Sequence, residues 1–547
     1  MGGEDAIDYD LADFFARVVV VRNHINGEKS MTDLLTELAH NHPDKLALVD
    51  DRPDGTIIRW SYAELEANAN ALGRVFQNAG VEPGNRIIWC GQNSSWVVAT
   101  GMAARKIGAV AVPLNYRLTA EEAAYVVDNS DAVLIFADTA YARLFADMRG
   151  DIPQVREVMI FDGAPAAGQL EVKPLLENVS GDELIVDAQP GAAGTMIYTS
   201  GTTGRPKGAV RKNLGDPSQI AALIEMMGLQ SDDVYLTTGP LYHSGPSGFM
   251  AFAFAFGNTV VLQRKFDAQD WLRLIDKYRV SFTFSAPTPV RLATQLPVEI
   301  LARYDLSSIR VTVANAAPWS FALKKAYLEH FPADSLFEVY GSTELGVNTI
   351  MLPQDQLRKP GSCGQAAPGV EIILIDEEGD EVTEPHAPGE IFIRSPSVFS
   401  TYHKAQDKYL EDRRGDMQTV GDIAYFDEEG FYYICDRKKD MIISGGVNIY
   451  PAEIEAALEH HPDILDVAVF GIPSEDWGES VHAVVVKRRG ASLDDAAIEA
   501  FAREHLAGYK VPRSVEYRDE IPRTGTGKIL KRELRAPWWE GHTSGVA

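Results

Sequence analysis

Short apolar runs separated by longer amphipathic stretches mark the first third of the chain. Three of these runs are almost wholly apolar and have the length of buried strands: residues 86–90, 110–113 and 132–137. The stretches between them are long enough to form helices. Strands that alternate with helices predict a mostly parallel sheet with helices packed on it.

Helix-start signals accompany these runs. Ser61 with Glu64, and Thr119 with Glu122, match the Ser/Thr-x-x-Glu pattern in which both side chains cap a helix N-terminus. A further helix is expected over residues 95–107, which a glycine follows. The helices therefore have locally encoded starts and ends.

The pattern changes further along the chain. Strand–helix alternation continues to about residue 340, but between 370 and 435 the apolar runs are short and joined by acidic, glycine-containing turns. After residue 437 a helix that begins at Pro451 and new apolar runs indicate an α+β unit. The change in pattern separates a β-rich stretch from a C-terminal unit.

We therefore expect an α/β protein of more than one domain. A large N-terminal domain of helix-covered sheets is predicted for residues 1–438, with a small β-rich subdomain at about 350–436. An α+β C-terminal domain is predicted for residues 439–547.

The composition excludes several classes of protein. Of 547 residues, 51 are Lys or Arg and 78 are Asp or Glu, so the formal charge is −27, which argues against nucleic-acid and anionic-membrane binding. Cys90, Cys363 and Cys435 form no CxxC unit, so neither a disulfide framework nor a zinc site is expected. The apolar tract 249–256 is too short to be a transmembrane segment, and with no signal-peptide pattern the predicted location is cytoplasmic.

The most informative segment is the glycine- and hydroxyl-rich stretch at residues 198–208, YTSGTTGRPKG. Its backbone N–H groups, hydroxyls and lysine can surround an anion such as a polyphosphate. The Walker pattern GxxxxGK[ST] does not fit it. The stretch therefore indicates nucleotide chemistry of another kind.

Four further motifs follow this stretch in order: YGSTE at 340–344, TVGD at 419–422, DRKKD at 436–440 and PRTGTGK at 522–528. Together the five resemble the adenylate-forming superfamily of acyl-CoA synthetases, peptide-synthetase adenylation domains and beetle luciferases. The resemblance covers about residues 30–535, and the stretch 440–455 is most similar to fatty-acyl- and aryl-CoA ligases.

This resemblance implies an ATP-dependent acyl-CoA synthetase. Such an enzyme converts a carboxylic acid to an acyl-AMP with loss of pyrophosphate, and then transfers the acyl group to the thiol of CoA. Three alternatives share the fold: a stand-alone adenylating enzyme that loads a carrier-protein thiol, a luciferase-like oxygenase and a non-catalytic binding protein. The implied ligands are ATP, Mg²⁺, CoA and a small carboxylic acid.

The resemblance also implies a nucleotide site. The phosphates would be held by a set in and after the glycine-rich stretch: Thr199, Ser200, Gly201, Thr202, Thr203 and Lys207. Glu344 would bind magnesium and Thr343 would reach the α-phosphate. The adenosine would be held by Ala316, Tyr340, Gly341, Asp422 and Arg437. Lys528 would bridge the carboxylate and the α-phosphate during adenylation.

The acid and CoA sites are implied by fewer residues. His243 matches a residue at the acyl pocket, with a role in proton transfer left open, and Phe249, Phe252, Phe254 and Phe256 either line an acyl tunnel or pack in the core. Relatives rotate a mobile C-terminal domain about the position of Lys439. CoA would then contact the candidates Gly445, Gly446, Trp477, Lys510 and Arg513.

Three segments depart from the family pattern. Arg211-Lys212-Asn213 stands where relatives commonly carry a hydroxyl residue and a histidine, Asp436 stands in place of a glycine, and residues 315–319 form a bulkier turn. We therefore expect acid specificity near His243 and residues 211–213. The acid itself (fatty, aryl, steroid or terpenoid) and a homodimeric state are left open.

Overall fold

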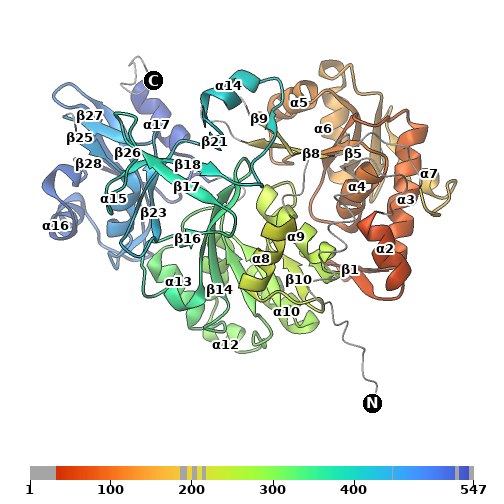
Figure 1. Ribbon diagram of the computed structural model, residues 1–547, viewed down its shortest axis with the longest axis horizontal. Helices are drawn as coiled ribbons and strands as arrows, with labels where there is room; N and C mark the ends of the chain where they lie inside the picture. Colours follow the sequence, from red (N-terminus) through yellow and green to blue (C-terminus); the bar gives the residue numbers. More distant parts are fainter. Residues whose placement is uncertain are drawn as a thin grey trace.

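The computed structural model describes residues 33–184, 194–199, 206–211, 217–445, 447–523 and 529–540. Within these ranges the chain forms four β-sheets with helices packed around them (Figure 1). The described α-helices are α2 (Leu34–Asn41), α3 (Tyr62–Asn78), α4 (Ser95–Lys106), α5 (Ala120–Asn129), α6 (Ala142–Asp147), α7 (Val172–Leu176), α8 (Pro217–Met227), α9 (Ser244–Ala255), α10 (Ala268–Tyr278), α11 (Pro287–Thr294), α12 (Val298–Leu301), α13 (Phe321–Leu328), α14 (Gln406–Glu411), α15 (Pro451–Leu458), α16 (Asp495–His505) and α17 (Lys531–Trp539).

Sheet A, of nine described strands, is parallel in its centre and antiparallel at both edges. Its order is β16 (Gln365–Ala366), β15 (Gly346–Met351), β14 (Leu336–Ser342), β13 (Val311–Ala314), β12 (Phe282–Ser285), β10 (Val234–Thr237), β11 (Thr259–Leu262), β1 (Leu46–Asp51) and β2 (Ile57–Ser61).

Sheet B, of eight described strands, is also parallel except where β8, β9 and β19 pair. Its order is β19 (Thr401–Tyr402), β9 (Lys207–Arg211), β8 (Gly194–Thr199), β4 (Val110–Pro113), β3 (Arg86–Cys90), β5 (Ala132–Asp138), β6 (Glu157–Phe161) and β7 (Leu170–Glu171). β19 comes from the distant β-rich stretch, so this pairing joins two regions of the chain.

Sheets C and D follow in sequence and are mainly antiparallel. Sheet C comprises β20 (Arg413–Arg414), β21 (Met417–Gln418), β18 (Gly389–Arg394), β22 (Asp422–Phe426) and β23 (Tyr432–Arg437), with β17 (Glu371–Ile375) beside β18. Sheet D comprises β25 (Val447–Ile449), β24 (Ile442–Ser444), β27 (Gly478–Lys487) and β26 (Ile464–Ser474), with β28 (Ser514–Tyr517) beside β27. The predicted boundary between residues 438 and 439 falls between β23 and β24 and stays a prediction.

The architecture confirms the predicted fold class. β3 and β4 have the predicted bounds, and both predicted capping boxes form. Glu64 Oε2 accepts a hydrogen bond from the Ser61 backbone N–H at 2.8 Å, while the Ser61 hydroxyl accepts from the Glu64 N–H at 3.2 Å. Such caps stabilise a helix by about 1 kcal/mol, so local signals fix where these helices begin.

The largest apolar cluster brings sheets A and B together through helices between them. Tyr62 and Phe76 of α3 are fully buried with Phe136 of β5 and Phe282 of β12. Because this core is shared, it fixes the distance between the ends of strands from both sheets. The candidate site uses side chains from those ends.

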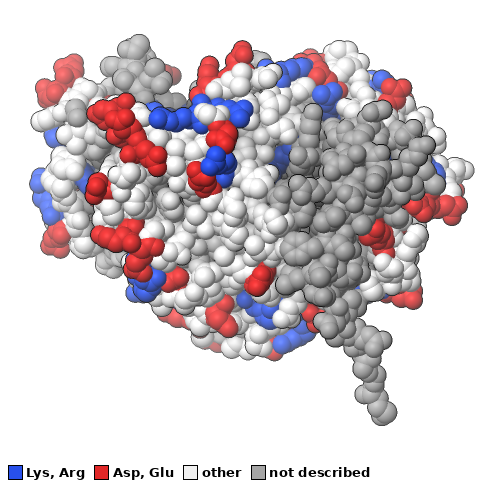
Figure 2. Space-filling view, in the orientation of Figure 1, with Lys and Arg blue, Asp and Glu red and all other residues white. Residues whose placement is uncertain are grey.

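The surface agrees with the charge count. Figure 2 shows acidic and basic side chains interspersed over the described part of one face, without a broad basic area there. Among the described helices, none is both long and apolar enough to cross a membrane.

Candidate active site

Glu344 lies in the tight connection between β14 and β15. Ser342 pairs with Gly346, so only three residues form the loop, and Gly346 adopts the left-handed φ of +77° that such a short hairpin requires. Glu344 Oε1 accepts hydrogen bonds from the Thr199 hydroxyl at 2.9 Å and the Tyr402 hydroxyl at 3.1 Å. Three distant segments thus meet at one carboxylate.

This carboxylate is buried, with 8% of the residue exposed. In the described part of the chain, no lysine or arginine lies within ion-pair distance of it. Its known partners are neutral hydroxyls, which hold a carboxylate without neutralising its charge. The charges of Arg211 and Arg437 lie nearby without forming an ion pair with it. A buried carboxylate that forms no ion pair among the described residues favours a cation as an additional ligand.

Lys207 and Thr199 lie opposite each other where β8 and β9 pair. Lys207 Nζ lies 5.7 Å from the centre of the Tyr402 ring. The predicted phosphate ligands Ser200, Gly201, Thr202 and Thr203 lie outside the described residues. The two described ends of their segment are nevertheless held together beside Glu344.

Thr343 is fixed on both its side chain and its backbone. Its hydroxyl shares a 2.7 Å hydrogen bond with the hydroxyl of Ser244, at the start of α9, and its carbonyl accepts from Arg211 Nε at 2.9 Å. Thr343 therefore connects the Glu344 hairpin with the His243 region.

A second carboxylate, Asp422, begins β22. Asp422 Oδ2 accepts a 2.7 Å hydrogen bond from the Tyr340 hydroxyl, and Oδ1 lies 3.3 Å from Arg437 Nε on the neighbouring strand. Burial, followed by the nearby Asp422 charge, raises the pKa of Tyr340 well above its usual value, so its hydroxyl keeps its proton. The structure brings these three predicted adenosine ligands together.

The backbone near Tyr340 is tight. A Cβ on Gly341 would lie 2.2 Å from the Gly346 carbonyl oxygen, so this position has no room for a side chain. Ala316, just after β13, has a left-handed φ of +73°, which is unfavourable for a residue with a Cβ. The bulkier turn noted in the sequence therefore contains real backbone strain.

His243 precedes α9, and its ring centre lies 4.3 Å from that of Tyr242. Burial, with a smaller contribution from the Arg117 charge, lowers the pKa of His243 to about 4. The imidazole is therefore neutral near pH 7. Its Nε2 is buried and has no hydrogen-bond partner among the described residues.

A small apolar cavity of about 10 Å³, room for about one water molecule, lies between α8 and α9. It is lined by Ile220, Leu223, Ile224, Met227, Leu229, Phe249, Phe252 and Val347. Phe249 and Phe252 are three residues apart on a helix and so share one face. Phe254 and Phe256 are not among the lining residues, so the four phenylalanines do not line the cavity as a set.

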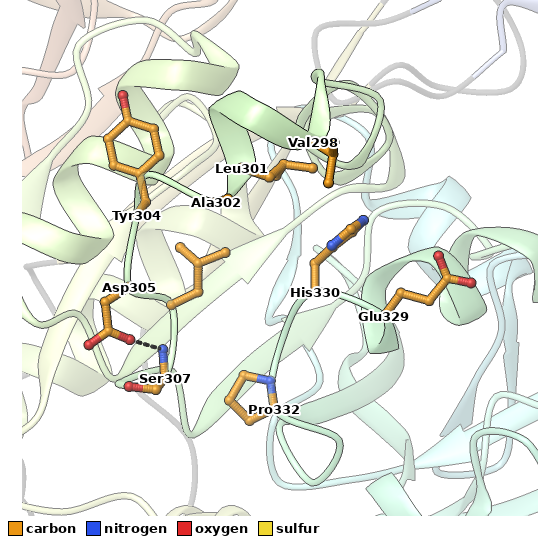
Figure 3. Close-up of a pocket in the computed structure, with 10 residues that line it drawn as sticks. Val298, Leu301, Ala302, Tyr304, Asp305, Ser307, Glu329, His330 and Pro332 are labelled. Atoms are coloured by element: carbon orange, nitrogen blue, oxygen red, sulfur yellow. Dashed lines mark hydrogen bonds between the residues drawn. The ribbon is translucent and has the colours of Figure 1, made fainter.

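A larger cavity, of about 420 Å³, lies away from these residues at α12 and the end of α13 (Figure 3). Its ten lining residues include the acidic Asp305 and Glu329 and no lysine or arginine. Asp305 accepts a hydrogen bond from the Ser307 N–H at 2.9 Å. Asp305 is paired with Arg279, and none of the predicted nucleotide ligands lines this cavity, so it is not the candidate nucleotide site.

The predicted CoA residues form a cluster in the C-terminal unit. Gly445 donates its N–H to the Trp477 carbonyl at 2.8 Å, and a Cβ on Gly445 would lie 2.7 Å from the indole ring. The Arg513 guanidinium lies 4.7 Å from that ring, and 45% of Trp477 is exposed. Lys510 is paired with Glu453 at 2.6 Å, whereas Gly446 and Lys528 lie outside the described residues.

Side chains at the predicted hinge contact helices α15 and α17 of the C-terminal unit. The Lys439 carbonyl accepts a 3.4 Å hydrogen bond from Arg535 Nη1. Asp436 Oδ2 accepts the Ala452 N–H, in the first turn of α15, at 3.0 Å and lies 3.7 Å from Lys531 Nζ. The aspartate that departs from the family pattern is thus bonded across the hinge.

Sequence reasoning missed Tyr402 and Ser244 and gave Arg211 a different place. Tyr402 and Ser244 lie far in sequence from the residues they contact, so no local signal in the sequence indicated them. Arg211 was expected near the acid, but its two described hydrogen bonds go to the carbonyls of Thr343 and Ser397.

Comparison with known proteins places this geometry in a family. Residues 35–403 match the model described as AMP-binding enzyme, and residues 453–528 match its C-terminal domain. The chain is 35% identical to an indoleacetate–CoA ligase of Aromatoleum aromaticum, over 88% of this chain and 95% of the relative. It is 32% identical to a fatty acid–[acyl-carrier-protein] ligase of Streptomyces coeruleorubidus, over 88% and 92%.

A solved structure supports the same relationship. ATP-bound MatB from Rhodopseudomonas palustris superposes with a TM-score of 0.81 at 28% identity, covering 93% of this chain and 99% of that one. The chain therefore belongs to the AMP-binding enzyme family, which confirms the predicted relationship and the predicted class of ATP-dependent acid–thiol ligase.

Proposed function

We propose that this acyl-CoA synthetase activates a carboxylic acid with an apolar body. The reaction uses ATP, the acid and CoA, as the relatives named as CoA ligases indicate. The observation that carries the proposed site is the meeting of Thr199, Tyr402 and Glu344 beside Lys207. Hydroxyls, one carboxylate and one ammonium at the ends of a glycine-rich stretch fit a metal-bound triphosphate.

Magnesium would be held by Glu344. Mg²⁺ that arrives with a nucleotide keeps several waters and phosphate ligands, so one protein carboxylate suffices. The described residues contain no group of three acidic, histidine or cysteine side chains that could hold a metal alone. When bound, the ion would neutralise negative charge on the phosphates during pyrophosphate loss.

The ribose would be held by Asp422. Its carboxylate is oriented by Tyr340 and Arg437 and can accept hydrogen bonds from two adjacent hydroxyls. Ala316 and Gly341 provide close backbone for the adenine. The Thr343 hydroxyl, held by Ser244, would donate to the α-phosphate.

The apolar body of the acid would lie between α8 and α9, where the side chains would have to move apart because the cavity holds only about 10 Å³ in this structure. All eight lining side chains are apolar, so a charged or strongly polar tail would lose its hydration without compensation there. Because Val347 follows Gly346 in the Glu344 hairpin, the cavity lies near the reacting end. His243 is neutral near pH 7 and would contact the acid as a hydrogen-bonding group, with no charge of its own.

CoA is favoured over a carrier protein by the Gly445–Trp477–Arg513 cluster. An exposed indole stacked with a guanidinium offers a flat surface and a positive charge to a nucleotide-bearing thiol. Rotation of the C-terminal unit about Lys439, a homodimer and a cytoplasmic location stay predictions.

Pyrophosphate release measured over a panel of carboxylates, with and without CoA, tests this function. We expect fatty or aryl acids without a second charge to give release, and their CoA thioesters to accumulate when CoA is present. Dicarboxylates and amino acids serve as controls. Release with dicarboxylates alone would contradict the apolar acid site, and thioester formation only with a carrier protein would contradict CoA.

Lys528→Ala separates the two half-reactions. We expect it to lower acid-dependent ATP–pyrophosphate exchange by at least about 100-fold, because the ammonium is needed only while charge gathers at the α-phosphate. Thioester formation from supplied acyl-AMP should be largely spared. Equal loss of both activities would contradict the adenylation role of Lys528.

A further inference from the structure

Arg211 ends β9, four residues after Lys207 on the same strand. Its Nε donates to the Thr343 carbonyl at 2.9 Å and its Nη2 to the Ser397 carbonyl at 2.6 Å. Within the described residues no carboxylate lies within ion-pair distance of this guanidinium. Because the largely buried guanidinium donates to two backbone carbonyls, it stabilises the backbone conformation of the segments that carry them.

Both carbonyls belong to segments that hold Glu344. Thr343 directly precedes it, and the segment from Ser397 runs to Phe399, whose N–H donates to the Glu344 carbonyl at 2.7 Å. The same segment then supplies Tyr402, whose hydroxyl bonds the Glu344 carboxylate at 3.1 Å. Arg211 therefore joins the two chain segments that determine where this carboxylate points.

We propose that Arg211 is a positioning residue that sets the Glu344 carboxylate for its cation. This inference rests on the proposed magnesium role of Glu344. The guanidinium is suited to the task because its planar donors reach two carbonyls at once, which a lysine ammonium on a flexible stem does not reproduce. Its charge also lies near Glu344 without pairing with it, so the carboxylate remains open to a metal.

The packing around Arg211 leaves little freedom for the hairpin. A Cβ on Gly346 would lie 2.6 Å from the Ser397 Cβ and 3.6 Å from Arg211 Nη2. The hairpin thus approaches the Ser397 segment as closely as a glycine permits. If Arg211 loses its hydrogen bonds, the two carbonyls lose fixed partners at the point where the segments touch.

The alternative is that Arg211 selects the acid, as the sequence first indicated. The acid cavity does not include Arg211 among its lining residues, and two donors of the guanidinium are already used by backbone carbonyls. The geometry favours the positioning role.

Mn²⁺ binding measured by electron paramagnetic resonance tests the inference without turnover. The full-length protein is saturated with α,β-methylene-ATP and titrated with Mn²⁺, and nucleotide affinity is measured separately without metal. Outer partners of metal ligands typically contribute 10–100-fold to metal affinity. We expect Arg211→Met to weaken Mn²⁺ binding by about 10-fold or more, Arg211→Lys to weaken it less, and metal-free nucleotide affinity to be unchanged.

Arg149→Met is the matched control. Arg149 also donates to two backbone carbonyls, those of Ile152 at 3.0 Å and Val155 at 2.8 Å, but it lies in the connection between α6 and β6 and has no described contact with a site residue. Its loss should lower thermal stability and leave Mn²⁺ affinity unchanged.

Three outcomes would overturn the inference: unchanged Mn²⁺ affinity in both Arg211 variants, the same loss in Arg149→Met, or a changed acid preference with intact metal binding. If Arg211→Met does not fold, the test uses Arg211→Lys alone. Weaker Mn²⁺ binding by that variant would support the inference, and unchanged Mn²⁺ binding would overturn it. Failure of the unaltered protein to bind Mn²⁺ with the nucleotide would instead overturn the proposed role of Glu344, and with it this inference.

Discussion

The two ends of the candidate nucleotide site hold their carboxylates in opposite ways. At the metal end, Glu344 is bonded by the neutral hydroxyls of Thr199 and Tyr402. At the ribose end, Asp422 is bonded by the Tyr340 hydroxyl and paired with Arg437. Glu344 is oriented by hydroxyls and forms no described ion pair, so its negative charge is available to a metal ion. Asp422 is already paired with an arginine, so it is suited to accept hydrogen bonds from the neutral hydroxyls of the ribose.

Glu344→Gln is expected to have the largest effect. The amide oxygen is a far weaker magnesium ligand, so ATP–pyrophosphate exchange should fall by at least about 100-fold and not recover at high magnesium. Asp422→Asn made in parallel provides the contrast, since it should leave the magnesium dependence unchanged. If ATP–pyrophosphate exchange depended on magnesium in the same way in both variants, Glu344 and Asp422 would not differ in the roles given to them.

Asp422→Asn should act on the sugar. The amide keeps one acceptor and loses the charge, so we expect the KM for ATP to rise by about 10-fold with a smaller change in kcat. The decisive measurement is the ratio of kcat/KM for ATP and 2′-deoxy-ATP. That ratio should approach unity in the variant, and an unaltered preference for ATP would show that Asp422 does not read the ribose.

Tyr402→Phe tests the neutral hydroxyls of the metal end. Loss of one hydrogen bond to a charged carboxylate corresponds to about 1.5 kcal/mol, which is about tenfold in apparent magnesium affinity. The Tyr402 ring beside Lys207 is kept in this variant, so the metal-free binding of ATP should not change. An effect confined to ATP binding would assign Tyr402 to the phosphates.

Ala316→Gly should give the smallest effect, on stability. Relief of the left-handed φ of +73° is offset in part by the greater freedom of glycine in the unfolded chain, so we expect the free energy of unfolding to rise by about 0.5–1 kcal/mol. Urea denaturation measures it. A loss of stability would mean that the Ala316 methyl group contributes more by packing than its backbone costs.

Local signals account for what the sequence predicted well. Both capping boxes and the bounds of β3 and β4 depend on residues within one helical turn or one strand. Glu344 and Asp422 were recognisable because each stands in a short motif. Such features require no knowledge of which strands pair.

The partners of these residues could not be predicted, because they depend on long-range pairing. Tyr402 reaches Glu344 only because β19 adds to the edge of sheet B beside β9. Of the four phenylalanines considered for an acyl tunnel, only Phe249 and Phe252 line the cavity, because they lie three residues apart on one face of the helix α9. Arg211 was placed near the acid because only its type, and not its carbonyl partners, is visible in the sequence.

The contacts of Asp436 cross the predicted hinge at Lys439. Its carboxylate bonds the first turn of α15, where the helix dipole favours a negative charge, and lies near Lys531. If the C-terminal unit turns about Lys439 in each cycle, these contacts must break and form again every time. The dwell time of the enzyme in one orientation would then depend in part on the side chain next to Arg437.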